Sequence, residues 1–438
     1  MKFESRGSQV GLAMTATVAL CAAGALPSAA LADPPMPSGT TVNPWTLVFE
    51  DTFDGTAVDT TKWGYRGDIH TNPANNKTPQ SWQVPGNVSL DGAGNLKIAL
   101  TTSSDPTKAP FSGGGLISQR KFRYGYYETR ASMNKGSGWH SAFWMMDWDI
   151  ANQVPTPTRS TEIDGFEVDS VAATSPLNNI RNNIITWVRN SNTTASFYKT
   201  TGVHNSGLDL TAFHTYGVLW TEAGVTYYID GSPVNYVNGS PAASGFQAYP
   251  PSAYMHDMVS IWLSTIAYTG GTPVVDPTYN ATLWDYVRYW QSDYYVDNSS
   301  TSYATGGPTG GPDGTYAETA GTWAASGLTG WTSANPTRYA ACGVAGATAT
   351  WTPNLQVAGN YEIFAWNVVY SSSDTNARYD VLGVGSAPAT FVNGSTGSSG
   401  WVSLGTYALA QGTGASVQLT SSGTGCARAD AVKFVRRS

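Results

Sequence analysis

The sequence contains little charge, since Asp, Glu, Lys and Arg make up only 12% of its 438 residues, about half of the usual ~25%. Long stretches of helical periodicity are missing too, which excludes a coiled coil or a helical bundle. With a net charge of −7, the chain is not expected to bind nucleic acid, because phosphate recognition needs clustered Lys and Arg. Aromatic residues are plentiful instead: 16 Trp, 24 Tyr and 13 Phe favour β-strands and can fill a large core.

Histidine and cysteine are also scarce. The five histidines are scattered without the spacing of metal ligands, so zinc catalysis is not expected. Of the three cysteines, Cys21 belongs to an N-terminal segment that we expect to be removed. Cys342 and Cys426 are then the only pair, and in an oxidising compartment they are expected to form a disulfide.

The first 32 residues have the pattern of a secretory signal peptide. Lys2 and Arg6 precede an apolar stretch that begins at Val10, and Ala-Leu-Ala at 30–32 forms a cleavage site of the A-x-A type. A membrane anchor is the alternative, but Thr and Gly interrupt the apolar run and small residues follow it. No later stretch is apolar enough to span a bilayer. We therefore predict a secreted, extracellular protein with no membrane partner, and a monomer by default.

A run rich in Gly, Pro, Ser and Thr divides the rest of the chain. This run, residues 298–314, cannot pack and is predicted to be a linker. Residues 33–297 contain many short aromatic and β-branched runs, such as LVFEDTF and YGYYETRASM, separated by turn residues. Residues 315–438 alternate apolar and polar positions in short runs. We predict an all-β protein: a β-jelly-roll sandwich followed by a smaller C-terminal β-sandwich.

One stretch clusters acidic residues in a chain that has few charges. Glu162, Asp164 and Glu167 would lie on one face of a strand if a β-bulge inserted one extra residue after Asp164, because side chains alternate between the two faces. Gly165 is the residue type that eases such a bulge. Carboxylates on one sheet face repel one another, so folding alone gives no reason to place these three there.

Catalysis gives such a reason. Retaining glycoside hydrolysis uses two carboxyl groups ~5–5.5 Å apart, one as the nucleophile and one as the acid/base. A third carboxyl group between them helps to separate their pKa values, so that the groups take distinct roles at one pH. The alternatives are an acidic hairpin that faces solvent and a calcium site.

The stretch around these acids resembles glycoside hydrolase family 16, a superfamily that includes laminarinases and agarases. Its signature E-x-D-x-(x)-E lies on a strand of a β-jelly roll, and the longer form matches Glu162, Asp164 and Glu167. GWHSAFWMM, FHTYGVLWTEAGVTYYIDG and DYVRYW resemble other strands of the family, and the resemblance covers residues 44–297. It implies a retaining endo-glycosidase in which Glu162 is the nucleophile, Asp164 assists it, and Glu167 is the acid/base.

The resemblance also implies a polysaccharide substrate, although the residues around the acids depart from the family pattern. Gly165 replaces an apolar residue, and Val-Asp-Ser follows Glu167, where laminarin-degrading members have Tyr-x-Gly. A β-1,3(-1,4)-glucan is the first expectation, and an agar-type or other β-galactan is the second. A lectin-like binder without hydrolysis is a third alternative, but a binder would not need both glutamates.

Substrate contacts are expected from aromatic side chains, because sugar rings expose C–H faces that stack on them. Trp139 and Trp144, just before the acidic strand, are the predicted substrate-binding residues together with His140. The reaction is expected to require no cofactor. Many members of the family bind a structural calcium ion remote from the acids, and the matching region here includes Glu50 and Asp285.

The C-terminal segment shows no set of residues arranged for catalysis. Its stretches GTWAASGLTGW and GNYEIFAWN resemble the golvesin/xanthan-lyase-type carbohydrate-binding-like domain. The resemblance implies a module that binds polysaccharide and raises the local substrate concentration, with a purely structural appendage as the alternative. Four tryptophans are candidate sugar contacts, although the alternation around the third is more typical of a core position: Trp323, Trp331, Trp366 and Trp401.

Overall fold

The computed structural model describes most of the chain after the predicted signal peptide. The predicted signal peptide and residues 299–312 of the predicted linker lie outside the described residues. Among the residues that are described, no helix is long and apolar enough to cross a membrane. The described residues are 34–35, 44–71, 79–146, 159–169, 179–191, 194–205, 207–234, 236–237, 240–241, 246–249, 258–267, 275, 281–298, 313–331 and 336–438.

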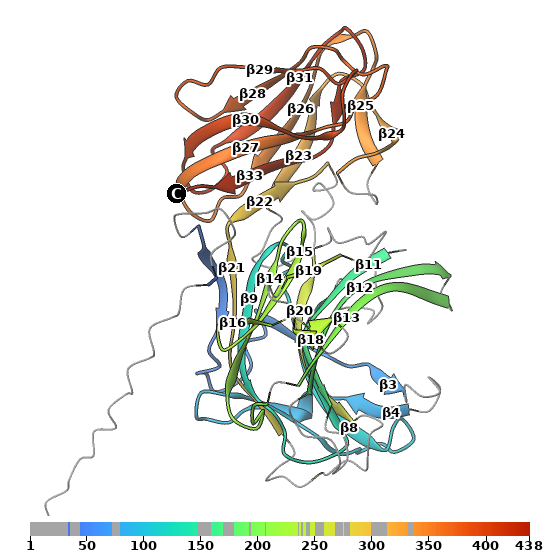
Figure 1. Cartoon of the computed structure of the whole chain (residues 1–438), viewed down its shortest axis with the longest axis vertical. Helices are drawn as coiled ribbons and strands as arrows, with labels where there is room; N and C mark the ends of the chain where they lie inside the picture. Colours follow the sequence, from blue (N-terminus) through green and yellow to red (C-terminus); the bar gives the residue numbers. More distant parts are fainter. Residues whose placement is uncertain are drawn as a thin grey trace, which may run out of the picture. The chain divides into compact units, whose positions relative to one another are not determined.

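Two large sheets form the first sandwich (Figure 1). In spatial order, the nine-stranded sheet consists of β16 (Ser232–Val234), β15 (Gly224–Ile229), β14 (His214–Trp220), β9 (Gly125–Ser132), β21 (Ala281–Gln291), β6 (Leu96–Ala99) and β5 (Val88–Leu90), with β1 (Thr46–Asp51) beside β21 and β19 (Phe246–Ala248) beside β15.

The twelve-stranded sheet carries the acidic strand. In spatial order it consists of β18 (Ser240–Pro241), β17 (Tyr236–Val237), β13 (Thr194–Asn205), β12 (Asn179–Ser191), β11 (Arg159–Asp169), β10 (Trp139–Met146), β20 (Ser260–Ala267), β8 (Phe111–Ser118), β4 (Pro79–Gln83) and β3 (Ile69–Thr71), with β2 (Trp63–Tyr65) and β7 (Thr101–Thr102) beside β8. A short 3₁₀ helix, η1 (Pro85–Asn87), precedes β5.

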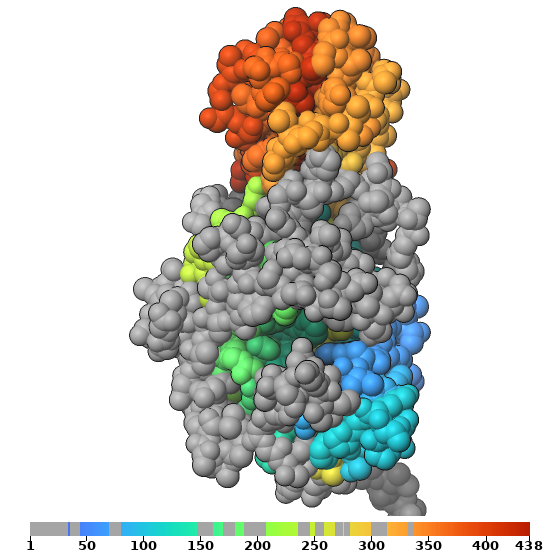
Figure 2. All heavy atoms as spheres, turned by 90° about the vertical axis from the view of Figure 1, so that its right-hand side faces the viewer, coloured from blue at the N-terminus to red at the C-terminus, as the bar shows by residue number. Residues whose placement is uncertain are grey.

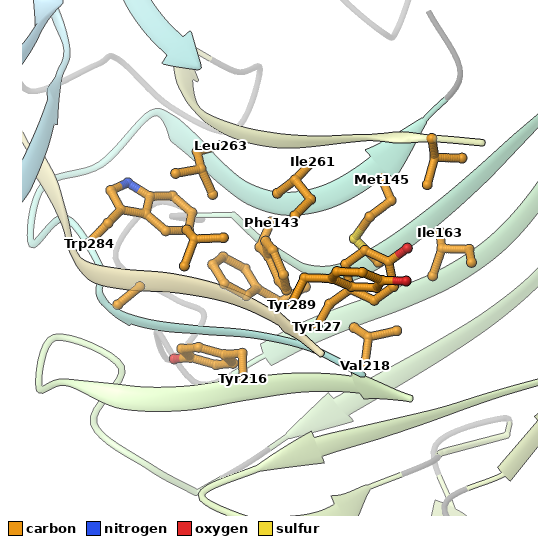
Figure 3. Packing of buried hydrophobic residues seen from close by; sticks show 14 of the residues in the cluster. Tyr127, Phe143, Met145, Ile163, Tyr216, Val218, Ile261, Leu263, Trp284 and Tyr289 are labelled. Atoms are coloured by element: carbon orange, nitrogen blue, oxygen red, sulfur yellow. The ribbon is translucent and has the colours of Figure 1, made fainter. Parts of the chain in front are cut away.

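The core of the first sandwich lies between these two sheets. Figure 3 shows Phe143, Met145 and Ile163 of the twelve-stranded sheet packed towards Tyr127 and Tyr289 of the nine-stranded sheet. All five side chains are buried, and burial of such aromatic and aliphatic surface is the main favourable term in folding. The predicted all-β class with a β-jelly-roll catalytic domain is confirmed.

The opposite face of the twelve-stranded sheet has a different character. Along β11, the core residues Ile163, Phe166 and Val168 are fully buried, whereas Glu162 and Glu167 keep partial exposure. This alternation follows from the period of two in a strand. The acids therefore point away from the core, on the free face of the sheet.

The second sandwich is smaller and is also all-β. The four-stranded sheet consists, in spatial order, of β22 (Asp293–Val296), β33 (Val432–Arg436), β27 (Gly359–Asn367) and β30 (Gly400–Leu409). The five-stranded sheet consists of β23 (Gly314–Ala320), β26 (Ala345–Pro353), β31 (Ser416–Ser422), β28 (Ala377–Leu382) and β29 (Thr390–Val392). The three-stranded sheet consists of β24 (Trp323–Thr329), β25 (Pro336–Ala340) and β32 (Arg428–Ala429). In the space-filling view, the orange-to-red atoms of this sandwich form one continuous body (Figure 2). Cys342 and Cys426 form the predicted disulfide.

The strand before the linker belongs to this second sandwich. β22 pairs with β33, and its Tyr294 and Val296 lie in the second hydrophobic core. The sequence assigned these residues to the catalytic domain, with a boundary after Asp297. Strand pairing moves that boundary to about the end of β21, because the main-chain hydrogen bonds of β22 are made to the last strand of the chain.

A partly buried cluster of polar and aromatic side chains joins the two sandwiches. Glu222, in the turn after β14, accepts hydrogen bonds from Trp331 Nε1 (2.8 Å), Trp401 Nε1 (2.7 Å) and Lys433 Nζ (2.9 Å). Trp331 also stacks on Tyr295, with ring centroids 5.1 Å apart. We call these five residues the Glu222 cluster. Burial opposes ionisation of Glu222, yet the charge of Lys433 and the hydrogen bonds hold its pKa below the ordinary value.

The Glu222 cluster bears on the prediction that C-terminal tryptophans contact polysaccharide, because it buries one of the four. Trp331 is only 6% exposed, and Trp366 and Trp401 pack against the core of the first sandwich. The Trp331 ring is therefore covered by protein, whereas Trp366 and Trp401 keep partial exposure and their contact with sugar stays a prediction. Of the four C-terminal tryptophans, Trp323 packs against the hydrophobic core of the second sandwich instead.

Asp293 near this junction gives a prediction about pH and stability. Burial raises its pKa to about 6, so the folded state holds the proton that the unfolded state releases near pH 4. Asp293 therefore costs stability as the pH rises through that window. Since the side chain keeps some exposure, we expect Asp293→Asn to gain only about 1 kcal/mol at pH ~7 and much less at pH ~4. Urea titrations at both pH values would measure this, and a gain that does not depend on pH would contradict it.

Candidate active site

Four carboxylates lie along the free face of β11. The register of β11 against β12 shifts between Asp164 and Glu167, and its register against β10 shifts at the same place. This is the predicted β-bulge. It returns Glu167 to the face that carries Glu162 and Asp164, and Asp169, two residues further, follows on that face.

Gly165 is required at the bulge by packing. A Cβ atom at this position would lie 2.7 Å from Phe143 Cδ1 and 2.9 Å from Val218 Cγ2, closer than two carbon atoms can approach. The glycine therefore lets the bulged strand lie against the core. This explains the departure from the family pattern, in which an apolar residue is usual at this position.

The Glu162 end of the row is held by an indole. Trp187 of β12 donates a hydrogen bond from Nε1 to Glu162 Oε2. The Trp187 ring packs against an apolar group that also contains Trp144, Trp262, Ile117 and Met146. We call these five residues the Trp144 patch. A packed donor of this kind fixes the direction of the carboxylate and favours its charged form.

An asparagine bridges the two central acids. Asn183 of β12 is fully buried, and its Nδ2 donates to Asp164 Oδ2 (2.6 Å) and to Glu167 Oε2 (2.6 Å). One amide group can donate two hydrogen bonds in this way. Asp164 itself is only 2% exposed. The bridge therefore reduces the repulsion between two carboxyl groups that the bulge brings together.

The Glu167 end of the row is surrounded by cationic or titratable groups. His140 Nε2 lies 3.6 Å from Glu167 Oε1, and His140 Nδ1 lies 2.6 Å from Asp169 Oδ1. Arg181 Nε lies 3.4 Å from Glu167 Oε2, and Arg181 Nη1 lies 2.5 Å from Asp169 Oδ2. Burial opposes ionisation of Asp169, but the hydrogen bond with His140 and the charge of Arg181 hold its pKa below the ordinary value.

The aromatic patch beside the acids includes one predicted substrate-binding residue. Trp144 is partly exposed, and its ring lies 4.6 Å from the ring of Trp262. The Arg66 guanidinium lies 5.6 and 5.7 Å from the centroids of these two rings and pairs with Asp68 at 2.5 Å. Trp144 is thus placed to present a ring face beside the carboxylates, and its contact with sugar stays a prediction.

Trp139 is placed differently from its prediction. It is fully buried in the core between the sheets, and its Nε1 donates to Gly136 O (2.9 Å). Because side chains alternate along β10, Trp139 and Trp144 must face opposite sides. His140 and Trp144 lie on the face of the acids, so Trp139 lies on the core face and cannot contact a sugar there.

The two candidate calcium ligands are both paired with arginine. Glu50 Oε1 accepts from Arg288 Nε at 2.7 Å, and Asp285 pairs with Arg130. Calcium needs six to eight oxygen ligands, and the described residues contain no group of three or more His, Cys, Asp or Glu that could hold a metal ion. Both acids are thus engaged by guanidinium groups, and a calcium ion at this place stays a prediction.

Comparison with known families gives the same assignment as the geometry. The family model described as Beta-porphyranase A-D, GH16 domain matches residues 45–292, which is more than half of the chain. The chain belongs to glycoside hydrolase family 16. This family 16 enzyme is therefore a hydrolase of O-glycosyl bonds. The family model of the Golvesin C-terminal domain matches residues 312–436, which is the second sandwich.

Curated relatives of the family 16 enzyme cover different shares of its length. Beta-porphyranase E of Zobellia galactanivorans is 27% identical over 250 residues, which are 55% of this chain and 85% of the relative. Glucan endo-1,3-beta-glucosidase A1 of Niallia circulans is 27% identical over 209 residues, 42% of this chain and 28% of the relative. Xanthan lyase of Bacillus sp. is 36% identical over 90 residues, 20% of this chain and 10% of the relative.

Among solved structures, porphyranase B of Zobellia galactanivorans aligns with a TM-score of 0.45 and 22% identity. The alignment covers 59% of this chain and 98% of that structure.

Several residues of the site were not predicted to take part in it. Asp169 shares the face of Glu167 by the period of two, so strand alternation alone could have indicated it. Arg181 and Asn183 reach the acids only because β12 pairs with β11 in the observed register. The sequence contains no local signal for that pairing.

Proposed function

We propose that this family 16 enzyme is a secreted, retaining endo-hydrolase of β-linked galactans of the agar or porphyran type. The row of carboxylates on β11 supports hydrolysis with retention, because it supplies two differently held glutamates on one face. The porphyranase family match over residues 45–292 supports a galactan as the substrate. Secretion is supported by the N-terminal signal pattern in the sequence.

The proposed reaction has two steps. In the first, Glu162 attacks the anomeric carbon, the glycosidic C–O bond breaks, and Glu167 gives its proton to the departing oxygen. In the second, Glu167 takes a proton from water, the water oxygen attacks the same carbon, and the ester bond to Glu162 breaks. The hydrogen bond from Trp187 stabilises the Glu162 carboxylate that leaves in the second step.

A β-1,3-glucan is the second candidate, since curated relatives include a glucan endo-1,3-beta-glucosidase. We place galactan first because the alignment with this chain covers 85% of the length of the porphyranase relative. The alignment with the glucanase covers only 28% of the length of that relative.

The substrate is tested with purified protein on agarose, porphyran, κ-carrageenan, laminarin and lichenan, with reducing ends as the readout. We expect a ladder of oligosaccharides from agarose or porphyran, and proton NMR of the first products should show the β-anomer. Release from laminarin or lichenan alone would overturn the galactan proposal. A first product with the α-configuration would overturn retention.

A further inference from the structure

The two oxygens of the Glu167 carboxyl group have different surroundings. Oε2 accepts from Asn183 Nδ2 at 2.6 Å and lies 3.4 Å from Arg181 Nε. Oε1 faces His140 Nε2 at 3.6 Å. Since N–H groups occupy Oε2, a proton on this carboxyl group is best accommodated on Oε1. The site therefore distinguishes the proton-bearing oxygen of the acid/base from the oxygen that only accepts.

Asp169 holds two of the three groups that make this distinction, His140 and Arg181. Its two oxygens lie 2.6 Å from His140 Nδ1 and 2.5 Å from Arg181 Nη1. An ionised carboxylate only accepts hydrogen bonds, so His140 must carry a proton on Nδ1. In neutral His140, the lone pair on Nε2 then faces Glu167 Oε1. Asp169 is also mostly buried, with 13% of its side chain exposed, so these contacts are shielded from water.

We propose that Asp169 is a positioning residue for the acid/base, acting through His140 on one oxygen of Glu167 and through Arg181 on the other. This inference rests on the proposed retaining mechanism and deepens it. Asp169 does not touch the reacting atoms. It keeps two side chains of β10 and β12 in the orientation that directs the Glu167 proton. His140 and Arg181 approach Glu167 directly, and Asp164 shares the Asn183 amide with it.

Two leaving groups that differ in their need for a proton can distinguish a positioning role of Asp169 from a purely structural one. A natural glycosidic oxygen must be protonated as it leaves, whereas a 2,4-dinitrophenolate leaves without a proton. Two substrates are compared: the polysaccharide that the parent cleaves, and the 2,4-dinitrophenyl glycoside of an oligosaccharide derived from it. We expect Asp169→Asn to lower kcat/KM for the polysaccharide about 10- to 100-fold, but to change kcat/KM for the dinitrophenyl glycoside less than ~3-fold. The kcat for the aryl glycoside should fall, because the second step still needs the base, and azide, a nucleophile that needs no base, should restore it.

A matched control exists in the same domain. Asp230 accepts from His214 Nδ1 at 2.7 Å in the turn between β15 and β16 of the other sheet. Asp230→Asn removes an Asp–His pair of the same kind and should leave both kcat/KM values near those of the parent. An equal fall on both substrates in Asp169→Asn would show a structural role and would overturn the proposal. Unchanged values on both substrates would overturn it as well.

A spectroscopic measurement tests the positioning role of Asp169 independently of the proposed hydrolytic function. Nitrogen-15 NMR of labelled histidine, with the His140 signal identified by its loss in His140→Gln, should show a proton on Nδ1 in the parent. That proton should exchange faster with water in Asp169→Asn. If the parent hydrolyses no glycan, the proposed function fails, and this measurement alone decides the inference. An unprotonated Nδ1 in the parent would overturn it.

Discussion

Replacing Glu162 with glutamine is expected to lower hydrolysis roughly 10⁴-fold or more, because the reaction then has no nucleophile. Glutamine keeps the size of the side chain and a polar oxygen next to the indole of Trp187. Binding of polysaccharide should therefore stay close to that of the parent. Reducing-end assays measure the first effect, and affinity electrophoresis in a gel that contains the polysaccharide measures the second.

A control for this substitution is available at a distance from β11. Glu362 of β27 pairs with Arg437 at 2.7 Å on the surface of the second sandwich. Glu362→Gln should leave the activity unchanged. If Glu162→Gln hydrolysed the substrate as fast as Glu362→Gln, Glu162 would not be the nucleophile, and the mechanism would need another carboxylate in that role.

Replacing Trp331 with alanine is expected to destabilise the folded protein by about 3 to 5 kcal/mol, as is usual for a buried large aromatic residue. The substitution removes the ring that stacks on Tyr295 and one of the hydrogen bonds to Glu222. It also leaves a cavity between the two sandwiches. Urea titration followed by tryptophan fluorescence measures the effect, together with circular dichroism as a second probe.

Trp323 supplies the comparison for Trp331. It lies in the same domain but keeps partial exposure, and its Nε1 donates to Ala320 O in an exposed position. Trp323→Ala should therefore cost clearly less, about 1 to 2 kcal/mol. Equal unfolding midpoints for Trp331→Ala and the parent would show that the Glu222 cluster contributes nothing to stability.

The sequence predicted the acidic face well because that information is local. The positions of Glu162, Asp164 and Glu167, the bulge between them, and the disulfide all depend on nearby residues or on the only available pair. The same rule of alternation, applied to β10, would have corrected Trp139. It places Trp139 and Trp144 on opposite faces, so only one of them can lie beside the acids.

The remaining features depend on contacts between distant parts of the chain. Glu222 meets Trp331 and Trp401, which lie 109 and 179 residues later, and neither contact leaves a pattern in the sequence. The partners of Glu167 on β12 depend on strand register in the same way. β22 has strand character that fits either domain, and its pairing with β33 of the C-terminal sandwich leaves no pattern in the sequence.

The central claim is that Glu162 forms a covalent bond to the sugar, and trapping that intermediate tests it most directly. The protein would be incubated with an activated 2-deoxy-2-fluoro glycoside of its own oligosaccharide product, which slows the second step more than the first. Intact-mass spectrometry should show one added glycosyl group, and peptide mapping should place it on Glu162. Complete turnover without an adduct, or an adduct on another residue, would contradict the account.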